Sequence, residues 1–361
     1  MTHRADQRGQ LSIYTIMKSV LITAHGGNEN VAVRTIDPPV RSSGHALIRM
    51  HAATLNRVDI YMRNSGAGIT HTLPQIMGLD GAGTVEEIDS SERLLHVGQR
   101  VTLHPGIMCG RCEYCQRGNG VLCNAIQYLG EHRHGTFAEW VSVPVQNVFP
   151  IPDDLSWVHA AALGVNHLTA WRMLFTQARV QAGETVLIFG IGGGVSLAAL
   201  QLAQRAGLRT IVTSRSADKL ARATAMGAHA TINSAQQDVV KEVLHLTHGR
   251  GVDVVVENVG GPMWSLALKS LARGARLVTC GATAGDQPAA DLRRVFIRQL
   301  QIYGSTLGDL HEFRDLLAFV QQTGLRPVID SVFTIDQIHQ ALERLESGEQ
   351  FGKVALTLGA S

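Results

Sequence analysis

The sequence predicts an α/β fold in which a doubly wound parallel sheet follows a β-rich segment. Residues 185–189 form a β-branched, apolar strand that breaks into a glycine-rich turn and continues as an apolar helix to about residue 206. Strand-length and helix-length segments then alternate regularly. Before about residue 150, short strands such as 45–51 and 81–88 are separated by Gly, Pro and Asp. A chain of 361 residues, 45% of them hydrophobic, is long enough for the two domains that this pattern implies.

The alternating part contains six predicted strands. After 185–189 the strands span 210–214, 230–233, 252–259, 275–281 and 301–306, with helices at 218–226, 238–247, 263–272 and 292–300. Six strands that alternate with helices are typical of a doubly wound parallel sheet. Two short helices are expected within 155–174, and helices 311–323 and 335–346 with strands 328–333 and 353–358 close the chain.

The glycine turn predicts a dinucleotide site. Gly190 and Gly192 fit the start of the G-x-G-x-x-G pattern, although Val195 occupies the position of its third glycine. A turn poor in side chains lets a pyrophosphate approach the backbone, and the N–H groups that open the helix near Val195 face the anion. The alternative is a glycine-rich turn without a ligand, and the regular βα pattern favours the cofactor. The expected contacts are Gly190, Gly192, Gly193, Gly194, Val195 and Ser196.

Composition argues against nucleic acid and membrane partners. Thirty-two basic and 30 acidic residues give a net charge of +2, and no stretch of about 18 apolar residues occurs. Residues 1–16 are polar, lack the apolar core of a signal peptide, and are interpreted as an N-terminal extension. Met17 is an alternative to Met1 as the natural start, and a cytoplasmic protein is expected.

Four of the five cysteines form the array C-x2-C-x2-C-x7-C. Four thiolates on one loop can enclose Zn²⁺ completely and leave no position for a substrate, which is typical of a structural site. Disulfides, an iron–sulfur cluster and incidental thiols are the alternatives, and zinc is favoured over them. The fifth cysteine, Cys280, ends an apolar strand and is interpreted as an inert buried thiol. The predicted ligands of one structural zinc per chain are Cys109, Cys112, Cys115 and Cys123.

These features together resemble the medium-chain dehydrogenase/reductase superfamily. The quoted motifs are Pro74-Gln75-Ile76-Met77-Gly78-Leu79-Asp80-Gly81-Ala82-Gly83, Gly135-Thr136-Phe137-Ala138-Glu139, Leu168-Thr169-Ala170-Trp171 and Phe351-Gly352-Lys353-Val354. The resemblance implies a GroES-like catalytic domain (17–160 and 305–361), a Rossmann domain (161–304), and a small-molecule substrate in the cleft between them. It also implies a homodimer or homotetramer, since relatives pair the last strand of the parallel sheet with its copy in a second subunit.

The sequence departs from the zinc alcohol dehydrogenases of this superfamily at the catalytic metal site. Asn56, Leu79-Asp80 and Val165 stand where those enzymes have Cys, His-Glu and Cys, and Val58 replaces a proton-relaying hydroxyl. One carboxylate cannot hold a catalytic zinc by itself. The pair His132 and His134 has the spacing of a metal site, but hydrogen-bonded or surface histidines are favoured there.

The stretch Leu55-Asn56-Arg57-Val58-Asp59-Ile60-Tyr61 instead resembles the zinc-free quinone oxidoreductases. We therefore expect an NADPH-dependent reductase of activated alkenes or quinones. An alcohol dehydrogenase or carbonyl reductase, and a nucleotide-binding regulatory or structural protein, are the alternatives. Asn56, Tyr61 and Thr169 are expected to hydrogen-bond the developing enolate oxygen, with Tyr61, His167 or water as the proton donor. A loop cap at Asn56 and a core aromatic at Tyr61 remain open.

The second strand of the sheet predicts the choice of cofactor. It ends in Ser214-Arg215, where an NAD enzyme usually places an acidic residue against the ribose. Ser214, Arg215 and Lys219 can all interact with a 2′-phosphate, which favours NADPH over NADH. A solvated arginine is the alternative at Arg215. Asn258 and Gly281 follow later strands and are expected to flank the ribose and nicotinamide, although Gly281 also suits a simple turn.

Overall fold

The structure is a computed structural model that describes residues 16–69 and 72–359. Within these residues the chain forms two compact units. The β-rich unit contains the described residues up to Gly164, Ser331–Ser347 and the segment from Val354 onward, and the parallel-sheet unit contains Val165–Asp330 and Gly348–Lys353. The expected N-terminal extension lies outside the described residues except for Ile16.

The parallel-sheet unit confirms the predicted doubly wound fold. Its strands are β11 (Thr185–Ile188), β12 (Arg209–Ser214), β13 (Ala230–Asn233), β14 (Val252–Glu257), β15 (Leu271–Thr279) and β16 (Gln301–Gly304). They pair in parallel in the order β13-β12-β11-β14-β15-β16, so the order reverses between β11 and β14. Ligands of such sheets bind outside the carboxyl ends of the strands at this reversal. The glycine turn follows β11, at that place.

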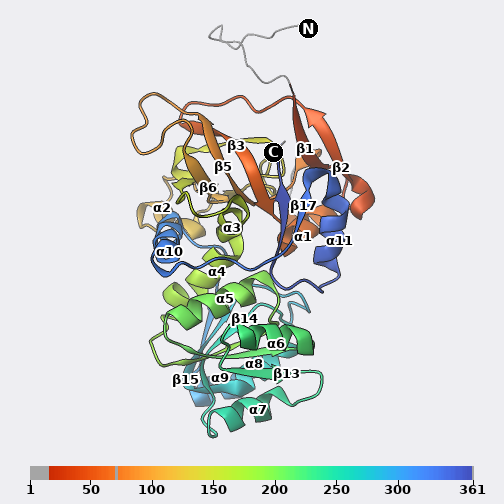
Figure 1. Cartoon of the computed structure of the whole chain (residues 1–361). Helices are drawn as coiled ribbons and strands as arrows, with labels where there is room; N and C mark the ends of the chain where they lie inside the picture. The colour runs from red at the N-terminus through yellow and green to blue at the C-terminus, as the bar shows by residue number, and fades with distance from the viewer. Residues whose placement is uncertain (1–15, 70–71, 360–361) are drawn as a thin grey trace. The chain divides into compact units, whose positions relative to one another are not determined.

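Helices alternate with these strands (Figure 1). They are α5 (Gly194–Arg205), α6 (Ala217–Ala225), α7 (Val239–Leu246), α8 (Pro262–Ser270), α9 (Leu292–Arg298) and α10 (Leu310–Thr323). Before them, the short helix α4 (Leu168–Trp171) lies between two π-helical turns, Leu163–His167 and Arg172–Gln177. Ser216, Asp238 and Asp309 cap α6, α7 and α10 with side-chain oxygens, as their residue types favour. Leu187, Val255 and Leu277 are fully buried, because helices cover both faces of a parallel sheet.

The β-rich unit is built from short antiparallel strands. They are β1 (Met17–Ile22), β2 (Val31–Ile36), β3 (His45–Thr54), β4 (Gln75–Ile76), β5 (Asp80–Glu87), β6 (Arg100–Leu103), β7 (Gly106–Ile107), β8 (Gln127–Tyr128), β9 (Trp140–Pro144), β10 (Val148–Pro150), β17 (Ile329–Thr334) and β18 (Lys353–Thr357). The largest sheet has the order β10-β6-β5-β3-β18-β17, with β9 also paired to β3. Helices α1 (Arg57–Ser65), α2 (Glu113–Gln116), α3 (Trp157–Ala161) and α11 (Ile338–Glu346) accompany the sheets. Short 3₁₀ turns occur at Asn28–Asn30, Gly66–Gly68, Gly120–Leu122, Val145–Asn147 and Ile335–Gln337.

The division into units differs from the expected domain boundary at residue 305. Residues as far as Asp330 remain with the parallel-sheet unit, because α10 is tied to the helical segment after α4. The Arg172 guanidinium donates to Glu312 at 2.8 Å in a buried ion pair, and Thr176 donates to the same carboxylate. A buried pair with several hydrogen bonds is costly to separate. The chain therefore rejoins the β-rich unit only from Ser331.

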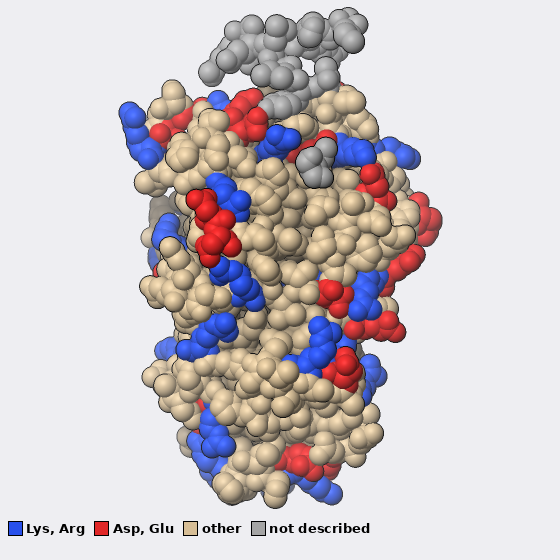
Figure 2. Space-filling view, viewed as in Figure 1, with Lys and Arg blue, Asp and Glu red and all other residues tan. Residues whose placement is uncertain are grey.

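None of the described helices is both long and apolar enough to cross a membrane. On the face drawn in Figure 2, basic and acidic side chains are interspersed. A mixed distribution of this kind produces no large field of one sign on that face.

Candidate functional site

The glycine turn of the parallel-sheet unit has the geometry of an anion site. Gly190 and Gly192 have φ values of 65° and 114°, which side-chain-bearing residues rarely adopt. The Ile191 N–H donates to the Thr213 carbonyl at 2.8 Å and holds the turn against the end of β12. Helix α5 begins at Gly194, one residue earlier than expected, and its N-cap Gly193 provides no side-chain hydrogen bond. The first N–H groups of α5 can therefore bind a phosphate.

Ser196 and Asn258 come together beside this turn. The buried Ser196 hydroxyl donates to the Phe189 carbonyl at 2.7 Å and accepts from Asn258 Nδ2 at 3.0 Å. Ser196 therefore fixes the turn with its only hydroxyl proton. Asn258 Oδ1 is buried without a hydrogen-bond partner among the described residues. An orphaned acceptor at the carboxyl end of β14 fits a ligand hydroxyl, as a cofactor ribose would provide.

Ser214, Arg215 and Lys219 have different surroundings. Ser214 Oγ accepts the Ser216 N–H at 3.1 Å, while Arg215 is exposed and makes no hydrogen bond or ion pair within the described chain. Lys219 Nζ donates to the Gly348 carbonyl at 2.6 Å, and its side chain lies beside Gly192. Lys219 thus connects α6 to the segment Gly348–Lys353, whose Gly352 N–H bonds the Gly192 carbonyl at 3.0 Å. The Arg215 guanidinium therefore remains available for a ligand, whereas the Lys219 ammonium group is already hydrogen-bonded within the protein.

Glu257 is a site residue that the sequence reasoning missed. Its fully buried carboxylate accepts the N–H groups of Val259 and Gly260, both at 2.8 Å, and burial raises its pKa above the usual range. It thereby shapes the turn after β14 that carries Asn258. The sequence signal that could have identified Glu257 is an acidic residue at the end of an otherwise apolar strand. A Cβ at Gly281 would lie 3.0 Å from the Asn258 carbonyl oxygen, so a glycine permits the close approach of the turn after β15.

Cys280, beside Gly281, has the chemistry of an inert thiol. Burial, with a smaller contribution from the Glu257 charge, raises the pKa of Cys280 to about 12. A thiol is nucleophilic only as the thiolate, so Cys280 is not activated at neutral pH.

His167 and Thr169 lie on neighbouring positions around the start of α4. His167 is buried, and its Nε2 lies 3.1 Å from Gln201 Oε1 on α5, while Gln201 Nε2 donates to the Arg326 carbonyl at 2.8 Å. These bonds hold the imidazole inside the parallel-sheet unit. Thr169 is also buried, with 6% of its surface exposed. The arrangement favours a packing role for His167 over that of a proton donor.

In the β-rich unit, Asn56, at a position expected to have lost a metal ligand, is hydrogen-bonded to Asp80, the one carboxylate that remains in the expected metal site. Asn56 Nδ2 donates to Asp80 Oδ2 at 2.9 Å, and the Thr54 hydroxyl donates to the same oxygen at 2.7 Å. All three side chains are buried. A second contact from Asn56 Nδ2 reaches the Thr54 carbonyl at 3.4 Å. The amide N–H groups of Asn56 are thus directed into the protein.

Asn56 also begins α1. It occupies the N-cap, and its backbone N–H donates to Asp59 Oδ2 at 2.6 Å, so the loop-cap interpretation applies together with the contact to Asp80. Tyr61, on the same helix, is 39% exposed. Burial of its ring raises the pKa of the phenol, which keeps it neutral and able to donate a hydrogen bond.

The histidine pair does not form a metal site. His134 Nδ1 accepts the Ile76 N–H at 3.2 Å, and His132 Nδ1 accepts the Tyr128 N–H at 3.2 Å. Each imidazole fixes a backbone turn, and burial lowers the pKa of both. Hydrogen bonding explains these residues, as the sequence favoured.

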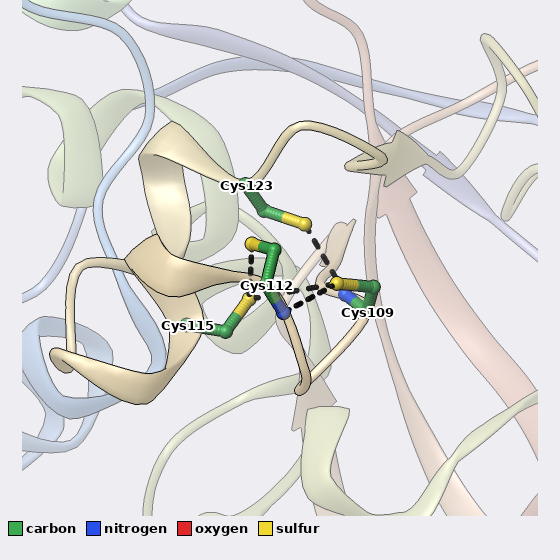
Figure 3. A group of neighbouring side chains, drawn as sticks. All are labelled: Cys109, Cys112, Cys115 and Cys123. Carbon is green, nitrogen blue, oxygen red and sulfur yellow. Dashed lines mark hydrogen bonds between the residues drawn. The ribbon is translucent and has the colours of Figure 1, made fainter.

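The four predicted zinc ligands converge. The sulfur atoms of Cys109, Cys112, Cys115 and Cys123 lie within 4.8 Å of one another and point toward a common centre (Figure 3). Tetrahedral thiolates bonded to Zn²⁺ at about 2.3 Å would be about 3.8 Å apart. The distances from Cys115 Sγ are 3.5 Å to Cys112 Sγ and 3.9 Å to Cys109 Sγ. The donor set and its spacing therefore fit a zinc ion.

The electrostatics of the cluster agree with a bound cation. Backbone N–H groups lower the pKa of Cys109 and bring that of Cys112 to about 6, while burial and the neighbouring sulfurs raise the pKa of Cys115 to about 12. Four crowded thiolates repel one another, and a divalent cation at their centre would remove this repulsion.

Replacing one ligand should remove the metal. We expect Cys112→Ser to lose zinc during dialysis against a chelator and to have a lower Tm, because three thiolates and a hydroxyl bind Zn²⁺ more weakly. Elemental analysis and thermal denaturation measure both effects. Cys280→Ser, in the other unit, is the matched control and should keep its zinc. Full retention of zinc by Cys112→Ser would contradict the assignment.

Comparison with known proteins gives consistent matches over both units. Residues 42–153 match the alcohol dehydrogenase GroES-like domain, and residues 194–322 match the zinc-binding dehydrogenase family. An alcohol dehydrogenase of Geobacillus stearothermophilus is 29% identical over 328 residues, which cover 90% of this chain and 95% of the relative. A quinone oxidoreductase of Mus musculus is 28% identical over 354 residues, which cover 95% of this chain and 98% of the relative.

A solved structure described as an NAD-dependent alcohol dehydrogenase is similar in fold and sequence. It has a TM-score of 0.91 and 38% identity, covering 95% of this chain and all of that one. Together with the glycine turn, the six-stranded parallel sheet and the cysteine cluster, these matches decide the family. The chain belongs to the medium-chain dehydrogenase/reductase superfamily and is an oxidoreductase.

Proposed function

We propose that the protein is an NADPH-dependent oxidoreductase that reduces an activated alkene, such as an α,β-unsaturated carbonyl compound, or a quinone, without a catalytic zinc. The observation that carries this proposal is the hydrogen bond between Asn56 and Asp80. By the motif resemblance, Asn56 and Asp80 correspond to two of the positions that form the catalytic metal site and its surroundings in the zinc alcohol dehydrogenases. An amide and one carboxylate that bind each other do not form a zinc site.

The absence of ligands at these positions restricts the acceptor. Reduction of a simple ketone places a full charge on one oxygen, which a Lewis acid or strong hydrogen bonds must stabilise. In an enone or quinone the charge is delocalised over a conjugated system. Such acceptors therefore suit a site whose residues offer only hydrogen bonds.

The chain's own groups would act on the acceptor oxygen. We propose Tyr61 and Thr169 as hydrogen-bond donors to it, since the neutral phenol of Tyr61 keeps its proton. Asp80 and Thr54 fix the orientation of Asn56. In this proposal Asn56 shapes the site, because its N–H groups face Asp80 and Thr54. A bound NADPH supplies the hydride.

An alcohol dehydrogenase or carbonyl reductase is the second candidate. The names of the Geobacillus relative and of the solved structure favour it, and the latter also favours NAD. The two candidates differ in the acceptor that the protein reduces.

A substrate panel separates the two candidates. Oxidation of NADPH and NADH would be followed with enones, quinones, aldehydes and ketones, and alcohols would be tested in the reverse direction. We expect turnover with enones or quinones and kcat/KM at least about tenfold lower with simple ketones. Turnover with aldehydes or alcohols alone would reject the proposed function in favour of the second candidate.

We propose NADPH as the cofactor on the basis of Arg215. The guanidinium is exposed after β12, and no described residue neutralises it. Arginine pairs with a 2′-phosphate through charge-assisted hydrogen bonds. The glycine turn, α5 and Asn258 would hold the rest of the dinucleotide.

Substitution of Arg215 tests the choice of cofactor. Arg215→Ala should weaken NADPH binding by about 1.5–3 kcal/mol, which is typical of hydrogen bonds to charged groups, with little effect on NADH. Adding Ser214→Asp should shift preference toward NADH. Dissociation constants measure both effects, and Arg209→Ala, at the other end of β12, is the control. Equal weakening of both cofactors by Arg215→Ala would show that the residue is a surface charge.

We also propose one structural zinc per chain and a homodimer or homotetramer. Strand β16 is an edge of the parallel sheet, and Ile302 on it and Phe296 on α9 are 40% and 68% exposed. An unpaired edge beside apolar side chains suits pairing with a second copy. A monomer in sedimentation at micromolar concentration would reject the assembly. The thiolate cluster suits a reducing compartment such as the cytoplasm, which cell fractionation would test.

A further inference from the structure

The side chain of Asn166 lies against the first residue of helix α5. A Cβ placed on Gly194 would lie 1.8 Å from Asn166 Oδ1 and 2.6 Å from Asn166 Cγ, so a larger residue at this position would displace the amide. Each Cα–Cβ bond of a helix is tilted toward the N-terminus of that helix. The Asn166 amide therefore lies beside the N-terminal end of α5, at the glycine turn that is the candidate dinucleotide site.

The neighbouring residue His167 fixes this segment on α5. His167 Nε2 lies 3.1 Å from Gln201 Oε1, and Gln201 follows Gly194 by seven residues, which is about two turns along the same face of the helix. Asn166 and His167 both belong to the π-helical turn Leu163–His167, a kind of turn that is frequent at functional sites. The packing role of His167 thus includes holding Asn166 at the start of α5.

The start of α5 has free hydrogen-bond donors that a ligand can reach. The N–H groups of Gly194 and Val195 donate to no atom of the described chain, as is usual in the first turn of a helix. Gly193, Gly194, Val195 and Asn166 are all partly exposed. An anion that binds the free N–H groups therefore also meets the Asn166 side chain.

We propose that Asn166 is a dinucleotide-binding residue whose amide Nδ2 donates a hydrogen bond to the diphosphate of the cofactor at the N-terminus of α5. The amide oxygen is the Asn166 atom nearest to the Cβ position of Gly194, so Nδ2 is turned away from the helix backbone. A neutral donor suits this place, because a carboxylate would repel the diphosphate. The inference rests on the cofactor part of the proposed function. It does not depend on the acceptor or on the choice between NADPH and NADH, since both cofactors contain the diphosphate.

Two substitutions of Asn166 test this contact in the full-length, zinc-containing protein without an acceptor. Asn166→Asp keeps the shape and adds a negative charge, so the dissociation constants of NADPH and NADH should rise by about a hundredfold, and by less at high salt. Asn166→Ala removes the donor without adding charge and should raise both constants by about tenfold. Gln322→Glu, at an exposed position of α10, is the matched control and should bind both cofactors as the wild type does.

The stability of the ligand-free protein is a second readout. A carboxylate beside a helix N-terminus interacts favourably with the helix dipole, so the Tm of Asn166→Asp should be about 1–3 °C above that of Asn166→Ala. Weaker cofactor binding together with a higher Tm cannot result from misfolding. A Tm below that of Asn166→Ala would place the carboxylate away from the start of α5 and would overturn the inference.

Gly194→Ala disturbs the same contact from the side of the helix. The added methyl group would displace the Asn166 amide, so this variant should weaken cofactor binding by about the same factor as Asn166→Ala. The double variant should bind no more weakly than either single variant, because each substitution removes the same hydrogen bond. Effects that multiply in the double variant would show that the two residues act independently, contrary to the inference.

ADP-ribose, which contains the diphosphate but no nicotinamide, identifies the part of the cofactor that Asn166 contacts. Its dissociation constant should rise in Asn166→Asp and Asn166→Ala by the same factors as those of NADPH and NADH. Weaker binding of the two dinucleotides with unchanged binding of ADP-ribose would assign Asn166 to the nicotinamide end and would overturn the contact with the diphosphate.

The possible failures are distinguishable. If the wild type binds a dinucleotide and the Asn166 variants bind it equally well, the role of Asn166 is wrong and the proposed cofactor stands. If the wild type binds none of NADPH, NADH and ADP-ribose, the cofactor part of the proposed function fails, and the role of Asn166 fails with it.

Discussion

The hydrogen bond between Asn56 and Asp80 is the constraint on which the proposed chemistry depends. Together with the Thr54 hydroxyl, it satisfies one oxygen of the buried Asp80 carboxylate. A catalytic zinc there would need further ligands, because Asn56 Nδ2 and Asp80 Oδ2 are already bonded to each other. The proposed acceptors, which need no Lewis acid to take up hydride, are chosen on this ground.

The rest of each unit positions groups around that chemistry. In the parallel-sheet unit, Ser196 and Glu257 form hydrogen bonds with backbone groups of the turns. The groups that remain available to a ligand are the N-terminus of α5, Asn258 Oδ1 and Arg215. In the β-rich unit, the cysteine cluster stabilises a long loop, while Gly130 and Gly135 press a second loop against Gly78. In the proposed account, zinc at the cysteine cluster has a structural role and hydride transfer needs no metal.

Local patterns in the sequence were enough to predict the parallel sheet, its glycine turn and the cysteine cluster. Strand periodicity and ligand spacing depend only on residues that are close together in the sequence. Roles of residues that depend on contacts between distant parts of the chain were harder to predict from the sequence. The hydrogen bonds of His167 with Gln201 and of Lys219 with Gly348 join residues that are far apart in the sequence, so local patterns did not predict them. The contact of Glu257 with Thr279 on β15 likewise joins residues that are separated in the sequence. The domain boundary depended on a similar contact, the Arg172–Glu312 pair.

We propose that this oxidoreductase acts with a structural zinc and without a catalytic metal. Metal content per chain, measured on the same preparation whose turnover with its acceptor is recorded, tests it most directly. The account predicts about one zinc ion per chain, all of it lost when the cysteine cluster is disrupted, and turnover that a chelator unable to reach this cluster leaves unchanged. Two metal ions per active chain, or loss of turnover when a weakly held ion is removed, would contradict it.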